Sequence, residues 1–208
     1  MVFILDRSGS MAGLESDTIG GFNAMVDKQR KEEGSALLSA VLFSDHSTVI
    51  YDRTDINDVV PMTEEQYSVG GTTALLDAIG QAVHHIKNVH KYAREEDRPE
   101  KTVFVITTDG MENASREYTY DKVSLMVAEQ QEQGWEFLFL GANMDAISTA
   151  RSFGIRGDRA VTYEADAAGT RLNFDVVSNA IGSIRRKEKL DSSWKEEIER
   201  DHAKRKKR

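Results

Sequence analysis

The sequence contains no cysteine, which rules out a disulfide framework and any metal site built on thiolates. It has no apolar run that approaches the ~20 residues needed to span a bilayer, and it does not open on a basic segment followed by an apolar one. A cytoplasmic location without membrane attachment is therefore expected. Acidic residues outnumber basic ones, 35 to 27, and the net charge of −8 argues against an extended surface for nucleic acid.

The chain does contain enough apolar sequence for one good-sized domain with a core of its own, since 39% of its 208 residues are hydrophobic. We assign residues 1–186 to this domain. From Lys187 onward the apolar period fades, charge takes over, and the chain ends in the basic run 204–208. We expect residues 187–208 to form the charged, solvated end of the last helix or a tail, and the alternative is a tail that binds nucleic acid or an acidic partner.

Predicted strands and helices alternate along almost the whole domain. The predicted strands are apolar runs at residues 2–5, 36–43, 47–51, 103–106, 135–141 and 159–164. The predicted helices cover residues 14–33, 74–92, 121–133 and 143–153 and a last stretch from residue 170. The polar segment 52–69 is expected to cross the surface as a loop. This order predicts an α/β fold, with a mostly parallel sheet, helices on both faces and one antiparallel edge strand from a hairpin.

Two of the predicted strands end abruptly in polar loops. Residues 2–5 are followed by Asp6-Arg7-Ser8-Gly9-Ser10, and residues 103–106 are followed by Thr107-Thr108-Asp109-Gly110. Ligands of open α/β sheets bind outside the carboxyl ends of the strands, so Asp6 and Asp109 both stand where a site is expected. The side chains of Asp6, Ser8 and Ser10 offer only oxygen, which suits Mg²⁺ or Mn²⁺ far better than zinc.

A third polar segment, Gly70-Gly71-Thr72-Thr73, directly precedes the helix predicted at residues 74–92. It places hydroxyls, and backbone N–H groups that we expect to be free, at the N-terminus of this helix. The register of the helix aims Thr73 at the tips of the strands. Asp, Ser and Gly also gather in ordinary strand-to-helix turns for structural reasons, so each segment alone is weak evidence for a site.

Together, the three segments resemble a metal-ion-dependent adhesion site. Its five parts are matched by Asp6-x-Ser8-x-Ser10, by a threonine in Gly-Gly-Thr-Thr-Ala-Leu-Leu-Asp-Ala-Ile and by Asp109 in Thr-Thr-Asp-Gly. The sequence thus resembles a von Willebrand factor type A domain from residue 2 to about 185, which implies a Rossmann-like fold. In such families the threonine stands five residues before a small residue followed by an aliphatic one, so Ala78-Ile79 selects Thr73 over Thr72.

The resemblance also implies a function. Ser8, Ser10 and Thr73 would bind the metal directly, and Asp6 and Asp109 would bind it directly or through water. The expected ion is Mg²⁺ or Mn²⁺, with one coordination position left for a glutamate or aspartate of a partner protein. The first hypothesis is therefore a metal-dependent protein-interaction module that is not an enzyme.

The second hypothesis is a Mg²⁺-dependent phosphoryl-transfer or hydrolase enzyme that uses Asp6. Several expected signals are missing from the sequence. There is no Gly-x-x-x-x-Gly-Lys-Ser/Thr phosphate loop and no Gly-x-Ser-x-Gly nucleophile motif. Ser8 stands where phosphoaspartate hydrolases of similar fold have an acidic residue, two positions after the nucleophile. The sequence therefore favours the interaction module.

Overall fold

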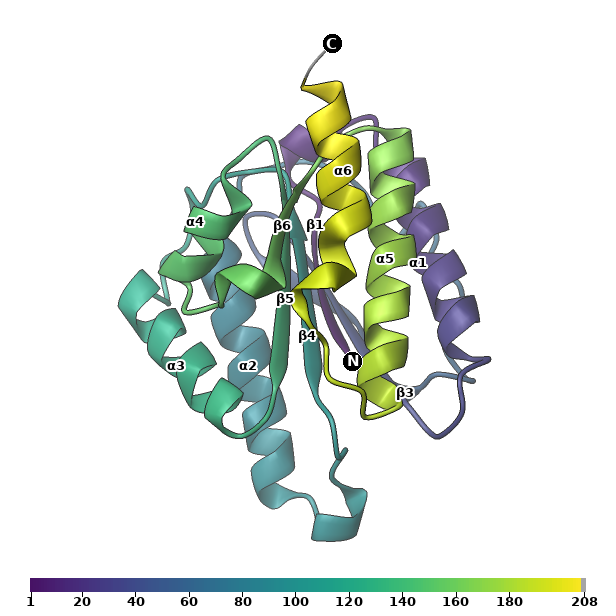
Figure 1. Cartoon of the computed structure of the whole chain (residues 1–208). Coiled ribbons are helices and arrows are strands. Elements are labelled where there is room, and N and C mark those ends of the chain that lie inside the picture. Colours follow the sequence, from purple (N-terminus) through teal and green to yellow (C-terminus); the bar gives the residue numbers. More distant parts are fainter. Residues whose placement is uncertain (207–208) are drawn as a thin grey trace.

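The computed structural model describes residues 1–206, and over this range it contains one six-stranded sheet covered by helices on both faces (Figure 1). The strand order is β3-β2-β1-β4-β5-β6. The strands are β1 (Val2–Asp6), β2 (Leu37–Phe43), β3 (Ser47–Asp55), β4 (Val103–Thr108), β5 (Glu136–Ala142) and β6 (Ala160–Tyr163). The β2–β3 pair is antiparallel and the other neighbouring pairs are parallel, so the predicted α/β fold and its antiparallel edge strand are confirmed.

The helices form two layers that bury opposite faces of the strands. They are α1 (Glu15–Gln29), α2 (Leu75–Tyr92), α3 (Tyr120–Glu132), α4 (Ala146–Ser152), α5 (Ala167–Arg185) and α6 (Glu196–Arg205). Figure 1 shows α1, α5 and α6 on one face of the sheet and α2, α3 and α4 on the other. In β1, Phe3 and Leu5 join the first core while Val2 and Ile4 join the second, which explains why this strand is apolar without alternation. No helix within residues 1–206 is both long and apolar enough to cross a bilayer.

Some helix ends differ from the prediction because nearby polar side chains cap them. The last predicted helix, α5, starts at Ala167 instead of residue 170. Asp166 caps this start by accepting a hydrogen bond from the backbone N of Gly169 (2.8 Å). The predicted helix 143–153 starts only at Ala146, after a similar cap by Asp145.

The segment predicted to cross the surface at residues 52–69 is partly buried instead. Strand β3 continues to Asp55, and the following loop places several side chains in the core beside α1 and α5, namely Ile56, Val59, Met62 and Tyr67. The segment is polar overall and contains Pro61, which is why its sequence suggested only a loop.

The prediction of a solvated helix end after residue 186 is wrong for the described part of that segment. Helix α5 ends at Arg185, and α6 packs as a separate helix against β6 and α5. Leu190 and Ile198 are 8% and 2% exposed and belong to the core. Lys207 and Arg208, the end of the predicted basic tail, lie outside the described residues. Whether residue 186 marks a domain boundary stays a prediction.

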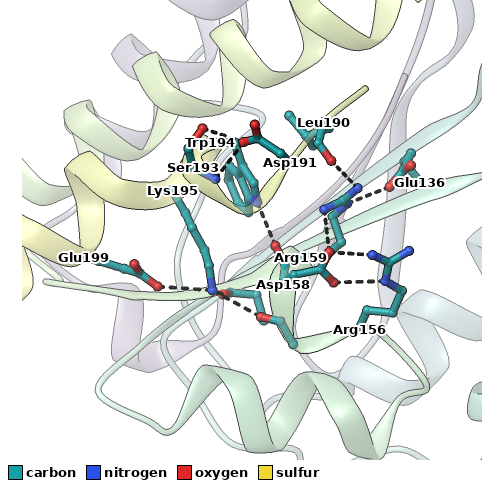
Figure 2. Close-up of polar contacts among 12 residues, drawn as sticks. Glu136, Arg156, Asp158, Arg159, Leu190, Asp191, Ser193, Trp194, Lys195 and Glu199 are labelled. Atoms are coloured by element: carbon teal, nitrogen blue, oxygen red, sulfur yellow. Dashed lines mark hydrogen bonds and ion pairs between the residues drawn. The ribbon is translucent and has the colours of Figure 1, made fainter. Parts of the chain in front are cut away.

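Polar contacts fasten this C-terminal segment to the open edge of the sheet (Figure 2). Lys195 is 6% exposed, and its Nζ donates to the carbonyl oxygens of Gly157 (3.1 Å) and Ala160 (2.7 Å). The indole of Trp194 donates to the carbonyl oxygen of Asp158 (2.9 Å). In the opposite direction, the buried Arg159 guanidinium donates to the carbonyl oxygen of Leu190 (2.7 Å). The segment is therefore held at the turn Gly157–Arg159 and at Ala160, the first residue of edge strand β6.

Candidate metal centre

The candidate site lies where the strand order changes direction, at the carboxyl ends of β1 and β4. These two strands are neighbours, with Leu5 paired in register with Thr107. From β1 the chain moves outward to β2 and β3, and it then returns through α2 to β4 on the other side of β1. Such switch points form the crevices in which open α/β sheets bind ligands. Asp6 and Asp109, separated by about a hundred positions in the chain, meet here.

Hydrogen bonds link four of the five predicted residues into one cluster. The Asp6 carboxylate accepts from the backbone N of Ser8 (2.7 Å) and from the hydroxyl of Thr108 (2.5 Å). The hydroxyls of Ser8 and Ser10 lie 3.1 Å apart, and the hydroxyl of Ser10 donates to the Asp109 carboxylate (2.5 Å). The strand tips and the turn after β1 thus bring Asp6, Ser8, Ser10 and Asp109 together.

Thr73 reaches the same cluster from the N-terminal end of α2. A Cβ atom added at Gly110 would lie 2.8 Å from the hydroxyl oxygen of Thr73 and 3.4 Å from that of Ser10. Thr73 is 3% exposed. Thr72, by contrast, is exposed and donates from its backbone N and its hydroxyl to Asp45, 2.5 Å in each case. The structure therefore places Thr73, and not Thr72, with the other four residues.

The two carboxylates of the cluster are buried without a cationic partner. Asp6 is 1% exposed and Asp109 is 9% exposed. Burial raises the pKa of both carboxyls above the ordinary value, and the hydrogen bonds from Thr108 and Ser8 to Asp6 offset this only in part. The negative charge of Asp109 raises the pKa of Asp6 further. None of the ion pairs among residues 1–206 involves either carboxylate, so a bound cation would relieve an unfavourable concentration of negative charge.

The donor set fits a hard divalent cation. Within the described residues, no group of three or more His, Asp or Glu side chains is arranged to hold a metal, so a metal at this cluster would depend on hydroxyls as well as carboxylates. Serine and threonine hydroxyls with two carboxylates form an all-oxygen set, and such sets suit Mg²⁺ or Mn²⁺. The cluster can therefore hold such an ion with Asp6, Ser8, Ser10, Thr73 and Asp109 as candidate ligands, and their role as ligands stays a prediction.

Supporting residues around the cluster were not identified from the sequence. The hydroxyl of Tyr67 donates to the backbone carbonyl of Asp6, and Tyr67 comes from the loop that was predicted to lie on the surface. The hydroxyl of Thr108 donates to the Asp6 carboxylate. The only feature of the sequence that could have indicated this role is the position of Thr108 next to Asp109 in Thr-Thr-Asp-Gly. Both residues hold Asp6 in place without offering a charge.

The backbone N–H groups predicted to be free at the start of α2 are occupied. The N of Leu76 donates to the Glu112 carboxylate (2.8 Å), and the N of Asp77 donates to the Ser115 hydroxyl (3.0 Å). The N of Ala74 donates to the carbonyl oxygen of Ser44 (2.8 Å). The prediction of free N–H groups is therefore wrong for these three residues, because the loop that follows Asp109 folds across this helix end and Ser44, directly after β2, binds Ala74.

Comparison with solved structures identifies the same overall fold in proteins of very different origin. Proximal thread matrix protein 1 from the mussel byssus, with zinc in its metal-ion-dependent adhesion site, aligns with a TM-score of 0.59 at 16% identity, over 87% of this chain and 45% of that one. A von Willebrand factor type A protein from Catenulispora acidiphila aligns with a TM-score of 0.55 at 14% identity, over 86% of this chain and 41% of that one. This chain thus spans less than half the length of either protein.

The manganese-loaded TRAP protein of Plasmodium vivax aligns with a TM-score of 0.54 at 14% identity, over 83% of this chain and 71% of that one. At such low identity these likenesses establish the fold alone. No curated protein matches the sequence. The family model of the von Willebrand factor type A domain, however, matches residues 1–173, most of the sequence. The chain therefore belongs to the von Willebrand factor type A domain family.

Proposed function

We propose that this protein is a metal-dependent protein-interaction module. Asp6, Ser8, Ser10, Thr73 and Asp109 would hold a Mg²⁺ or Mn²⁺ ion at the carboxyl end of the sheet, and the ion would bind a glutamate or aspartate of a partner protein. The observation that carries the proposal is the pair of buried carboxylates, which are linked through Ser8 and Ser10 and form no ion pair among residues 1–206. Structurally similar proteins with zinc or manganese bound lend further support.

The chemistry follows from the charges of the cluster. Two ionised carboxylates balance the charge of a divalent ion, while the serine and threonine hydroxyls add neutral oxygen ligands. An ion held in this way attracts a further anionic oxygen at any position that the protein leaves open. Ser10 is exposed, in contrast to the buried Asp6 and Ser8, so the cluster faces solvent on the side of Ser10. A partner carboxylate would approach from that side.

The enzyme hypothesis has weaker support from the same geometry. Each carboxylate oxygen of Asp6 accepts one hydrogen bond, from Ser8 or from Thr108, and keeps a lone pair for a metal ion. The side chain is buried, however, so a phosphate ester has less access to it than a bare ion has. Ser8, at the position expected for an acid or base, offers only a neutral hydroxyl, which lies 3.1 Å from that of Ser10. We therefore favour binding over catalysis.

The proposal is tested by substituting Asp109→Ala. The wild-type protein is expected to bind Mn²⁺, measured by electron paramagnetic resonance of the free ion, and the variant should lose this binding because one of two charged ligands is gone. Asp58→Ala, which changes an exposed carboxylate in the loop after β3, is the matched control and should bind normally. Absence of Mn²⁺ binding by the wild-type protein would refute the proposal.

Capture of a partner should follow the metal. In a pull-down, any partner held in Mg²⁺ should be released by EDTA and should not be retained by Asp109→Ala. Binding should also be lost when the partner's metal-binding glutamate or aspartate is replaced by glutamine or asparagine. Equal capture in Mg²⁺ and in excess EDTA would contradict the metal-bridged mechanism.

A second substitution tests the packing of the cluster. Gly110→Ala would place a methyl group 2.8 Å from the hydroxyl oxygen of Thr73, closer than such contacts allow, and buried Thr73 would have to shift. We expect Mn²⁺ affinity to fall about tenfold, because small displacements around a metal site have effects of this size. The control Gly20→Ala adds the same methyl group in open space on α1. Unchanged Mn²⁺ affinity in Gly110→Ala would show that Thr73 does not contact the ion.

A further inference from the structure

Helix α2 does not cap its own N-terminus. The residue before the helix is Ala74, which has no side chain able to accept a hydrogen bond. The caps come from residues 112–118, which we call the capping loop. Glu112 accepts from the backbone N of Leu76 (2.8 Å), and the hydroxyl of Ser115 accepts from the backbone N of Asp77 (3.0 Å). A carboxylate at this position is also favoured by the helix dipole.

The capping loop is itself held in shape by its contacts. Glu112 accepts three more hydrogen bonds, from the backbone N of Ala114 (2.9 Å) and from the backbone N and hydroxyl of Ser115 (2.8 Å each). From the helix side, the Asp77 carboxylate accepts from the backbone N of three consecutive loop residues, Arg116 (2.8 Å), Glu117 (2.9 Å) and Tyr118 (2.8 Å). The loop and the start of the helix therefore form one rigid unit.

One residue of the capping loop holds both backbone polar groups of Thr73. The backbone N of Thr73 donates to the side-chain oxygen of Asn113 (2.9 Å), and the backbone N of Asn113 donates to the carbonyl oxygen of Thr73 (3.0 Å). Asn113 lies four positions after Asp109, so the same loop carries one member of the metal cluster and clamps another. The Asn113 side chain is exposed, which allows it to be changed without disturbing the core.

We propose that the capping loop fixes Thr73 relative to Asp109 and thereby sets the affinity of the site for its metal, with Asn113 as the positioning residue. The inference rests on the proposed function. Without the two hydrogen bonds between Asn113 and Thr73, the hydroxyl of Thr73 samples several positions. Metal binding must then order this hydroxyl, which lowers the affinity for the metal. Residues that orient metal ligands in this way typically change affinity by about tenfold or more when they are replaced.

The test compares three variants with the wild-type full chain. Asn113→Leu removes the side-chain acceptor and keeps the branched shape and the number of heavy atoms, Asn113→Asp keeps an acceptor oxygen, and Asn179→Leu is the control at an exposed position of α5. Mn²⁺ affinity, melting temperature and amide hydrogen exchange at Thr73 are measured for each. We expect Asn113→Leu to bind Mn²⁺ about tenfold more weakly and to exchange faster at Thr73, with little change in melting temperature. Asn113→Asp and Asn179→Leu should behave like the wild type.

The outcomes separate this inference from the function on which it rests. If the wild-type protein binds Mn²⁺ and Asn113→Leu binds it equally well, the positioning role is refuted and the metal site stands. If Asn113→Leu and Asn113→Asp weaken binding equally, the acceptor oxygen is not what matters and the inference also fails. If the wild-type protein binds no Mn²⁺, the proposed function fails first and the inference falls with it.

Discussion

Replacing Asp6 by asparagine is expected to stabilise the metal-free protein and to abolish its stabilisation by Mg²⁺. In the folded chain, burial and the charge of Asp109 raise the pKa of Asp6. The folded state therefore binds the Asp6 proton more tightly than the unfolded state does. The metal-free protein gains stability from this group as the pH falls through the folded pKa, and it is penalised at neutral pH, where the buried carboxyl is ionised.

An asparagine at position 6 can keep the local hydrogen bonds. Its amide oxygen can accept from the backbone N of Ser8, and its amide nitrogen can donate to the hydroxyl of Thr108, because that hydroxyl can also act as an acceptor. The substitution thus removes the charge and leaves the shape. Because position 6 then no longer titrates, the site should contribute less to the pH dependence of the free energy of unfolding.

Mg²⁺ should stabilise the wild type and leave the melting temperature of Asp6→Asn unchanged. Binding to the folded state alone stabilises by about 2.7 kcal/mol at a hundred times the Kd, which corresponds to roughly 5–10 °C in melting temperature for a chain of this size. We expect such a shift for the wild type and none for Asp6→Asn, in thermal unfolding with and without Mg²⁺ at neutral and mildly acidic pH. A variant that is less stable without metal, or one that Mg²⁺ still stabilises, would contradict this account of Asp6.

Removal of residues 187–208 should destabilise the protein strongly. Burying a leucine or isoleucine side chain contributes about 1.5–3 kcal/mol, and the deletion removes both Leu190 and Ile198 from the core. It also leaves the buried Arg159 without the carbonyl of Leu190. We expect a loss of about 4 kcal/mol or more, seen as a melting temperature lower by about 10 °C. The deletion would also bare core side chains such as Val161 and Tyr163, which should promote self-association, measurable by light scattering.

Two point variants separate the contributions of single side chains in this segment to stability. Lys195→Met keeps the buried volume but leaves the carbonyls of Gly157 and Ala160 without their donor, which should reduce stability by about 1–3 kcal/mol. Arg205→Ala breaks ion pairs with Asp166 and Asp201 near the surface and should change stability by less than about 1 kcal/mol.

If the truncated protein were as stable as the full chain and stayed monomeric, α6 would be dispensable for the fold.

The elements of this fold could be predicted largely because their signals are local. Residues 2–5 and 103–106 are apolar on both faces, and both are buried parallel strands. The helix predicted at 74–92 has its bounds correct to within one residue, since a regular apolar stripe runs along it. The spacing Asp6-x-Ser8-x-Ser10 and the position of Asp109 at a strand tip were likewise readable, because a strand end followed by oxygen donors is a short-range pattern.

Apart from the starts of α4 and α5, which local caps by Asp145 and Asp166 explain, the errors share a physical cause, since they depend on contacts between segments far apart in the chain. The capping of α2 by Glu112 and Ser115 joins segments about forty positions apart, and nothing at residues 74–77 indicates it. The docking of the C-terminal segment depends on Lys195 finding backbone carbonyls at Gly157 and Ala160. A lysine in a charged stretch is normally exposed, so only its partners in the folded chain explain its burial.

By itself, the sequence determined the α/β class, the order of strands and helices, and the five polar residues that gather at the end of the sheet. The tertiary structure decided what holds Thr73 in place beside the other four residues and where the charged C-terminal segment lies. The first set follows from hydrophobic periods and strand ends, which act over a few residues. The second set depends on hydrogen bonds and apolar contacts between distant segments. These contacts form only when the chain folds, so no local sequence pattern indicates them.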